Sequence, residues 1–257
     1  MTRASTRTNF HSSQLLRTLA DLAVLPAAEP AAAFGEKLGL WIDFADAIAL
    51  TGVHNAGALD DATLAAQFAV DAPLDEEFNK MRAQLEGVIT KSLAPNTGRT
   101  RAELTLPKLD TPLDDVKAYA PFRRYHQAHQ RDMEMNVRNV RVKLREGVAK
   151  ASPRLRQLVA LDAAFDGILV EREGRLLASI PSLLEKRFNH LRKAHLQTLA
   201  DTQRTDDNPD LWMKPGAWLA RFCAELQAVL LAELDLRLQP AVGLLEAFLH
   251  EKTLEPV

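Results

Sequence analysis

The segment 121–156 constrains the fold of this chain more strongly than any other, because two helical patterns run along it together. Four arginines recur every seven residues, so they share one face of a helix and drift by only about 20° per repeat. We call them the arginine ridge: Arg124, Arg131, Arg138 and Arg145. On the opposite face, apolar residues and histidines recur at steps of three and four. We call them the seam: Phe122, His126, His129, Met133, Val137, Val140, Leu144 and Val148. The two patterns predict one long helix over residues 121–151.

Basic charge is concentrated in the same segment. Ten Lys or Arg and three acidic residues lie in 121–156, whereas the whole chain has a net charge of −2. Three interpretations of the ridge stay open: a solvated face, a contact for an acidic partner helix, or a contact for phosphates. A pI near 6.4, with aromatic residues that do not alternate with the basic ones, counts against nucleic acid. We favour a contact and predict that the ridge touches a partner or phosphates.

The composition favours helices throughout. Good helix formers such as Ala, Leu, Arg, Glu and Gln dominate, and the chain has only 11 Gly. After the long helix, Ser152 and Pro153 are typical of an N-cap and a first helical residue. Pro181 kinks or restarts the next helix. Pro215 opens a last long helix whose centre is apolar nearly all round. We predict an all-α fold in which 121–257 form an antiparallel long-helix bundle with coiled-coil-like packing.

The N-terminal part is predicted as a smaller helical module over residues 1–93. It carries a short first helix, a second helix at about 31–50 that ends before a loop at Gly52, and a third that begins at about Asp71 or Pro73 and ends at Leu93. Residues 94–120 read as a Pro-containing linker, because prolines recur too closely for a stable element. A stretch of this length without secondary structure is unusual inside one compact domain, so we place a domain boundary there.

No residue pattern in the sequence predicts a catalytic chemistry, since phosphate-binding, dinucleotide-binding and nucleophile motifs are missing. His126 and His129 have a spacing that could hold a metal, and His195 on a later helix could join them. We favour buried, hydrogen-bonded histidines and predict no catalytic residue, no metal site and no cofactor. Glu233 lies in an apolar run with Arg237 four residues later, which predicts an ion pair within one helix.

Cys223 is the only cysteine, so it cannot form a disulfide within the chain. Its apolar neighbours predict that it is buried as a small hydrophobic residue. No apolar run approaches the roughly 20 residues that a membrane-spanning helix needs. We therefore expect a cytoplasmic protein that is not itself inserted in a membrane.

Four strings give the chain a resemblance to a known family. They are Pro121-Phe-Arg-Arg-Tyr-His, Gln130-Arg-Asp-Met-Glu134, the segment from Leu231 to Pro240 (LAELDLRLQP), and WIDFADAIAL at 41–50. With them the chain resembles a bacterial family of unknown function that looks like ZorF, an accessory component of type III Zorya anti-phage defence systems. The match spans most of 121–250 and parts of 34–93.

The resemblance implies a setting and supplies no catalytic residue. In such systems a membrane-embedded, ion-driven motor (ZorA and ZorB) is encoded beside cytosolic effectors, and ZorF is paired with a second helical protein, ZorG. We therefore expect a cytosolic subunit that assembles with a ZorG-like helical partner through seam residues Phe122, His126, His129, Met133 and Val140. The alternative is a nucleic-acid-binding or metal-dependent nuclease effector that acts on phage DNA.

Overall fold

The computed structural model describes residues 13–22, 42–56, 74–92, 104–109, 117–203 and 207–254. In these ranges the chain is helical and contains no strand, which confirms the predicted all-α class. The elements are α1 (Gln14–Asp21), α3 (Phe44–Ala56), α4 (Leu74–Lys91), α5 (Ala120–Val148), α6 (Pro153–Leu177), α7 (Ile180–Asp201), a 3₁₀ turn (Pro209–Leu211) and α8 (Trp218–Leu254). None of these helices has the length and apolar character needed to cross a membrane.

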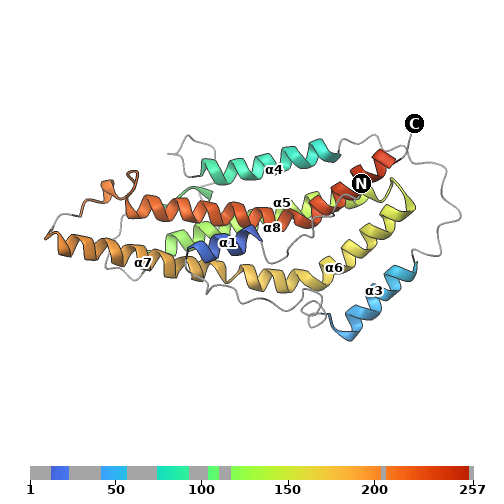
Figure 1. Ribbon diagram of the computed structural model, residues 1–257, viewed down its shortest axis with the longest axis horizontal. Helices are drawn as coiled ribbons and strands as arrows, with labels where there is room; N and C mark the ends of the chain where they lie inside the picture. Colours follow the sequence, from blue (N-terminus) through green and yellow to red (C-terminus); the bar gives the residue numbers. More distant parts are fainter. Residues whose placement is uncertain are drawn as a thin grey trace, which may run out of the picture.

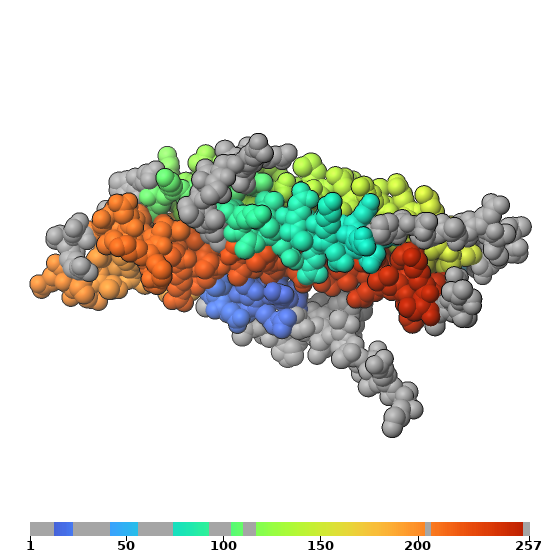
Figure 2. Space-filling view, turned by 90° about the horizontal axis from the view of Figure 1, so that it is seen from above, coloured from blue at the N-terminus to red at the C-terminus, as the bar shows by residue number. Residues whose placement is uncertain are grey.

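Helix α8 is the axis of the bundle. It contacts α1, α4, α5, α6 and α7, and Figure 1 shows it running through the middle of the molecule. Most of its centre is buried, including Val229, Leu230, Ala232 and Leu234, as its nearly continuous apolar sequence predicts, whereas Ala228 is exposed. Seen from above in Figure 2, α4 lies along α8 and α5, with α1 on the other side of α8.

Contacts between helices fix the directions of the long helices. Arg123 at the start of α5 pairs with Glu185 of α7, whereas Arg145 near its end pairs with Asp162 of α6. Helices α6 and α7, separated by only two residues, therefore run together antiparallel to α5. Arg187 of α7 pairs with Glu225 of α8, and His195, later in α7, stacks on Trp218 at the start of α8, so α8 runs antiparallel to α7 as well. The predicted antiparallel bundle of long helices is confirmed.

Aromatic side chains fill one end of the core. The ring of Phe188 lies 5.1 Å from Phe222, 5.5 Å from Phe122, 5.6 Å from Tyr119 and 5.4 Å from Trp218, measured between centroids. Tilted and edge-on contacts of this kind stabilise a core beyond the burial of apolar area. This cluster joins the beginnings of α5, α7 and α8.

The predicted start signal at Ser152 is confirmed. Its hydroxyl oxygen accepts a hydrogen bond from the backbone N–H of Leu155 at 3.1 Å, and Pro153 is the first residue of α6. The same hydroxyl donates to Glu251 near the end of α8 at 2.6 Å. One N-cap therefore begins α6 and also fixes it to the far end of α8.

Helix α3 differs from its prediction. It runs from Phe44 to Ala56 and passes through Gly52, where we had expected a loop. Asp43 and Asp46 each accept a hydrogen bond from the other's backbone N–H, at 2.8 and 3.1 Å, so they set the beginning of the helix. A glycine inside a helix costs only about 1 kcal/mol, so Gly52 does not end it. Most of the expected 31–50 helix lies outside the described residues.

The N-terminal helices pack on the bundle. Leu15 and Leu19 of α1, together with Phe78 and Ile89 of α4, belong to the same core cluster as the long helices. In the predicted linker, residues 104–109 and 117–120 are described, and Leu104, Leu109 and Tyr119 are buried. Packing on α5 and α8 thus extends across both the predicted module and part of the predicted linker.

Candidate functional site

The seam faces the interior of the protein. Phe122, His126, His129 and Met133 are at most 1% exposed, and Val140 is half-buried against the core. The seam is buried because α8, whose sequence is apolar nearly all round, packs along α5. The first four side chains therefore leave no surface for another protein, and a partner of the folded chain would contact other residues.

Where the seam meets α8, a charged network is buried. Glu233 has no exposed surface, and its carboxylate accepts hydrogen bonds from Gln130 Nε2 at 3.1 Å and from Arg237 Nη2 at 2.9 Å. Gln130 also donates to the backbone carbonyl of Leu177 at 2.9 Å, and Arg237 lies 4.0 Å from Glu173. The network joins α5, α6 and α8 and confirms the predicted pair of Glu233 with Arg237.

Burial decides the protonation behaviour of these groups. Loss of solvation raises the pKa of the Glu233 carboxyl, although Arg237 and the bond from Gln130 act in the other direction. Burial, the neighbouring His129 and Arg237 lower the pKa of His126 to about 3. Burial likewise lowers the pKa of His129 to about 4. Both imidazoles are therefore neutral at neutral pH.

The structure does not bring the three predicted histidines into one site. His126 Nε2 lies 3.6 Å from Glu233 Oε2, whereas His195 contacts Asp207 at 3.1 Å beside Trp212. Among the described residues, no three His, Cys, Asp or Glu side chains lie close enough to hold a metal ion. Cys223 is buried, as predicted, and burial raises its thiol pKa to about 12.

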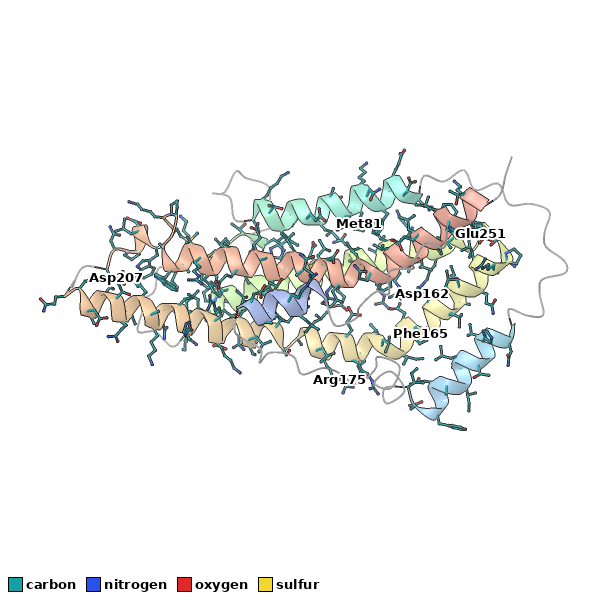
Figure 3. All side chains as sticks on the ribbon, viewed as in Figure 1. Met81, Asp162, Phe165, Arg175, Asp207 and Glu251 are labelled. Carbon is teal, nitrogen blue, oxygen red and sulfur yellow. The ribbon has the colours of Figure 1, made fainter. Side chains whose placement is uncertain are left out.

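The ridge is divided by its own geometry. Arg145 is internal: with Arg141 it contacts Asp162 and Asp166 of α6 at N–O distances between 2.6 and 3.0 Å. A seven-residue repeat drifts by about 20° per step on a straight helix, so after three steps Arg145 has turned about 60° away from Arg124. The predicted external contact at Arg145 is occupied by α6. Figure 3 labels Asp162 on α6.

The other three ridge arginines stay on the surface. Arg124, Arg131 and Arg138 are exposed. Two apolar side chains share their face of α5: Met135 is 54% exposed and Val142 is 44% exposed. The outward side of α5 is thus mainly basic, with Met135 between the arginines, Val142 after Arg138, and the exposed Glu134 between Arg131 and Arg138. We call the three arginines, Met135 and Val142 the outward face of α5.

Helix α3 presents a second surface. Its sequence is mostly apolar, yet none of its residues whose burial is described is buried. Phe44 is 82% exposed and Ile48, one turn later, is 58% exposed. Helix α3 packs along α6, and Gln157 of α6 donates a hydrogen bond to the carbonyl of His54. In Figure 1 this pair lies apart from the axis of the bundle.

Comparison with known families covers nearly the whole chain. The family described as "Protein of unknown function (DUF3348)" matches residues 1–250. The chain belongs to this family. No curated protein and no solved structure matches it. Because the family description names no activity, residue roles in this DUF3348 protein come from its own geometry.

Sequence reasoning missed the part that Gln130 plays in this DUF3348 protein. Its partner Glu233 lies 103 residues away, so no local pattern joins them. The sequence does indicate that both residues matter, because each lies in a string that resembles ZorF: Gln130–Glu134 and 231–240. The structure shows that these two strings meet in the buried network of α5 and α8.

Proposed function

We propose that this protein is a helical subunit of an anti-phage defence complex of the type III Zorya kind. In this proposal it acts by assembling with a ZorG-like helical protein, in a system driven by a ZorA- and ZorB-like membrane motor. The four strings that resemble ZorF support this setting. The proposed activity is assembly, and no catalytic step is assigned to the chain.

One observation carries the assembly part: the uncovered apolar surface of α3. Phe44 and Ile48 lie one turn apart and are mostly exposed, and Ala45, Ala47 and Ala49 around them are exposed as well. Covering a large apolar side chain contributes about 1.5–3 kcal/mol, so a helix laid across Phe44 and Ile48 gains a useful part of a binding energy. A partner helix with apolar residues at i, i+3 and i+4 fits this surface.

The experiment is co-expression with the neighbouring genes, followed by sizing of the purified complex. We expect a stable hetero-complex that Phe44→Ser with Ile48→Ser dissociates while the melting temperature of the isolated chain stays within about 2 °C, because both side chains are already exposed. Leu211→Ser with Met213→Ser is the matched control, since both of these side chains are 45% exposed at the other end of the bundle. The proposal would be overturned if the wild-type chain stays monomeric when it is co-expressed with the neighbouring genes. Full phage protection by the Phe44→Ser, Ile48→Ser variant would also overturn it.

The alternative function is a nucleic-acid-binding or metal-dependent nuclease effector. The observation that favours it is the exposed row Arg124, Arg131 and Arg138. If these arginines bind phosphates, the affinity for a DNA duplex should fall steeply with salt, with a log–log slope of roughly −2 to −3 for three contacts. A gel-shift series from low to physiological salt, with wild type and a triple Gln variant, separates this function from protein assembly.

A further inference from the structure

We infer that the outward face of α5 docks an acidic amphipathic helix of a protein partner. This surface is separate from α3, so the inference adds a second contact to the proposed assembly and can fail on its own. It consists of Arg124, Arg131 and Arg138 with Met135 and Val142 between or beside them. From Arg124 to Arg138 it extends about 21 Å at 1.5 Å per residue.

Much of the rest of α5 is covered, although Gln127, Glu134, Asn139, Lys143 and Glu146 are exposed as well. Helix α5 contacts α8, α4, α7 and α6, and its buried residues face them. Figure 2 shows part of α5 at the surface beside α4. The outward face is therefore an exposed, mainly basic side of this helix, away from the buried residues that contact its neighbours.

The charges on α5 are unequally matched. Arginines at its flanks are paired inside the protein: Arg123 with Glu185, and Arg141 and Arg145 with two aspartates of α6. By contrast, Arg124 and Arg138 have no acidic partner among the described residues. Successive arginines of the row are about 10.5 Å apart along the helix, and the exposed Glu134 lies between Arg131 and Arg138, so the face is mainly positive and would be complemented by an acidic partner.

The apolar side chains decide between a protein and a phosphate backbone. Met135 and Val142 are seven residues apart, as are the arginines, so the face repeats both chemistries at about 10.5 Å. A helix with an acidic residue and a Leu or Ile in each heptad repeats at the same distance and can satisfy both sets. Phosphates would neutralise the arginines and leave Met135 and Val142 uncovered. The geometry therefore favours a partner helix of at least two heptads.

The test uses the full chain and three fluorescent probes in anisotropy titrations at 50 mM and 150 mM salt. The first probe is a 21-residue synthetic helix with Glu and Leu once in each heptad, the second replaces every Glu by Lys, and the third is a 20-base-pair DNA duplex. We expect the acidic peptide to bind at least tenfold more tightly than either of the others. Its affinity should decrease with salt because the contact is partly electrostatic.

Substitutions then locate the contact. Arg124→Glu with Arg138→Glu should weaken binding of the acidic peptide by roughly tenfold or more, since it reverses two contacting charges. Lys186→Glu with Lys193→Glu on α7 is the matched control, because it makes the same change in net charge on exposed residues. Met135→Ser with Val142→Ser should weaken binding of the acidic peptide without changing how steeply its affinity decreases with salt concentration. Circular dichroism confirms that each variant is folded, and Arg124→Gln with Arg138→Gln replaces the reversal if it is not.

Three results would overturn the inference. The first is that the acidic peptide binds no better than the peptide with Lys in place of Glu. The second is that the charge-reversal variants of α5 and α7 lose equal affinity for the acidic peptide. The third is that the DNA duplex binds more tightly than the acidic peptide and loses affinity when the α5 charges are reversed. The last result would instead assign this face to nucleic acid. None of these outcomes bears on the Phe44 and Ile48 surface, which the co-expression experiment tests separately.

Discussion

Replacing Glu233 by Leu should destabilise the protein strongly, and a second substitution should repair the damage. Glu233 is fully buried and holds Arg237, whose side chain is only 10% exposed. Without the carboxylate, Arg237 keeps Glu173 at 4.0 Å as its one acidic neighbour among the described residues. Leaving one charge of a buried pair uncompensated costs about 3–5 kcal/mol. The double variant Glu233→Leu with Arg237→Met should return to within about 1–2 kcal/mol of wild type, because apolar residues of similar volume can replace a buried pair.

The two single variants should not be equally harmful. Arg237→Met leaves Glu233 buried, but burial has already raised the pKa of that carboxyl, so it can take up a proton and become neutral. Arg237 cannot respond in this way to Glu233→Leu, since a guanidinium does not lose its proton in proteins. We therefore expect Arg237→Met to be the milder single change, and milder still at pH 5 than at pH 8.

Urea denaturation followed by circular dichroism at 222 nm measures the cycle. With a slope of about 2–3 kcal/mol per molar urea, a loss of 4 kcal/mol lowers the midpoint by about 1.3–2 M. The coupling energy of the cycle should be at least about 2 kcal/mol. If Glu233→Leu shifts the midpoint by less than the experimental error, or if the double variant is as unstable as the single one, the network does not contribute as described.

Three further changes test other contacts. Burial lowers the pKa of His129 to about 4, below the ordinary 6.5, so the unfolded chain binds a proton that the folded chain does not. The free energy of unfolding is therefore highest above pH 6.5 and decreases as the pH falls toward 4. His129→Phe should reduce the slope of this free energy against pH by about 1.4 kcal/mol per pH unit. Urea titrations at several pH values measure the slope. Ser152→Ala should cost about 1 kcal/mol of unfolding free energy through the lost cap. Gly147→Leu should cost about 1–3 kcal/mol, because a Cβ there meets Leu74 at 2.7 Å, whereas Gly87→Leu, with open space around it, should stabilise the helix slightly.

Matched controls accompany these variants. Ser179→Ala removes a hydroxyl that donates to the carbonyl of Leu176 and caps no backbone N–H, so we expect less than about 0.5 kcal/mol. The raised pKa of Glu233 opposes the histidine effect between pH 4.5 and its own pKa, so wild type and His129→Phe are compared at equal pH. The cap prediction is contradicted if Ser152→Ala and Ser179→Ala lose equal unfolding free energy. The packing prediction is contradicted if Gly147→Leu and Gly87→Leu have equal effects. The histidine prediction is contradicted if His129→Phe leaves the slope of unfolding free energy against pH unchanged.

Local chemistry made several parts of the fold predictable. Ser152 begins α6 because a hydroxyl followed by Pro153 satisfies the first turn without help from distant residues. The pair of Glu233 and Arg237 depends on four-residue spacing alone. The prediction for helix α3 was wrong at both ends: the apolar periodicity begins well before the helix, whereas Asp43 and Asp46 carry its start signal.

Contacts between distant segments were out of reach. The seam had to be covered, but nothing near it in sequence shows that α8 covers it and leaves no place for a partner. Arg145 looked like its ridge neighbours because its partners Asp162 and Asp166 lie on the next helix. Gln130 resembles any polar residue of a long helix until Glu233 is placed against it. These residues take their roles from the tertiary arrangement, which periodicity does not encode.

The central place of α8 has a consequence for biosynthesis. This helix comes last among the described elements, and α1, the first of them, packs directly on it. About 200 residues separate the two, so at 5–20 residues per second α1 emerges from the ribosome about 10–40 s before its partner exists. During that interval the apolar sides of α1 and α4, including Leu15, Leu19 and Phe78, have no permanent cover. We therefore expect the nascent chain to depend on chaperones, and an interrupted α8 to produce aggregated protein in place of a smaller folded one.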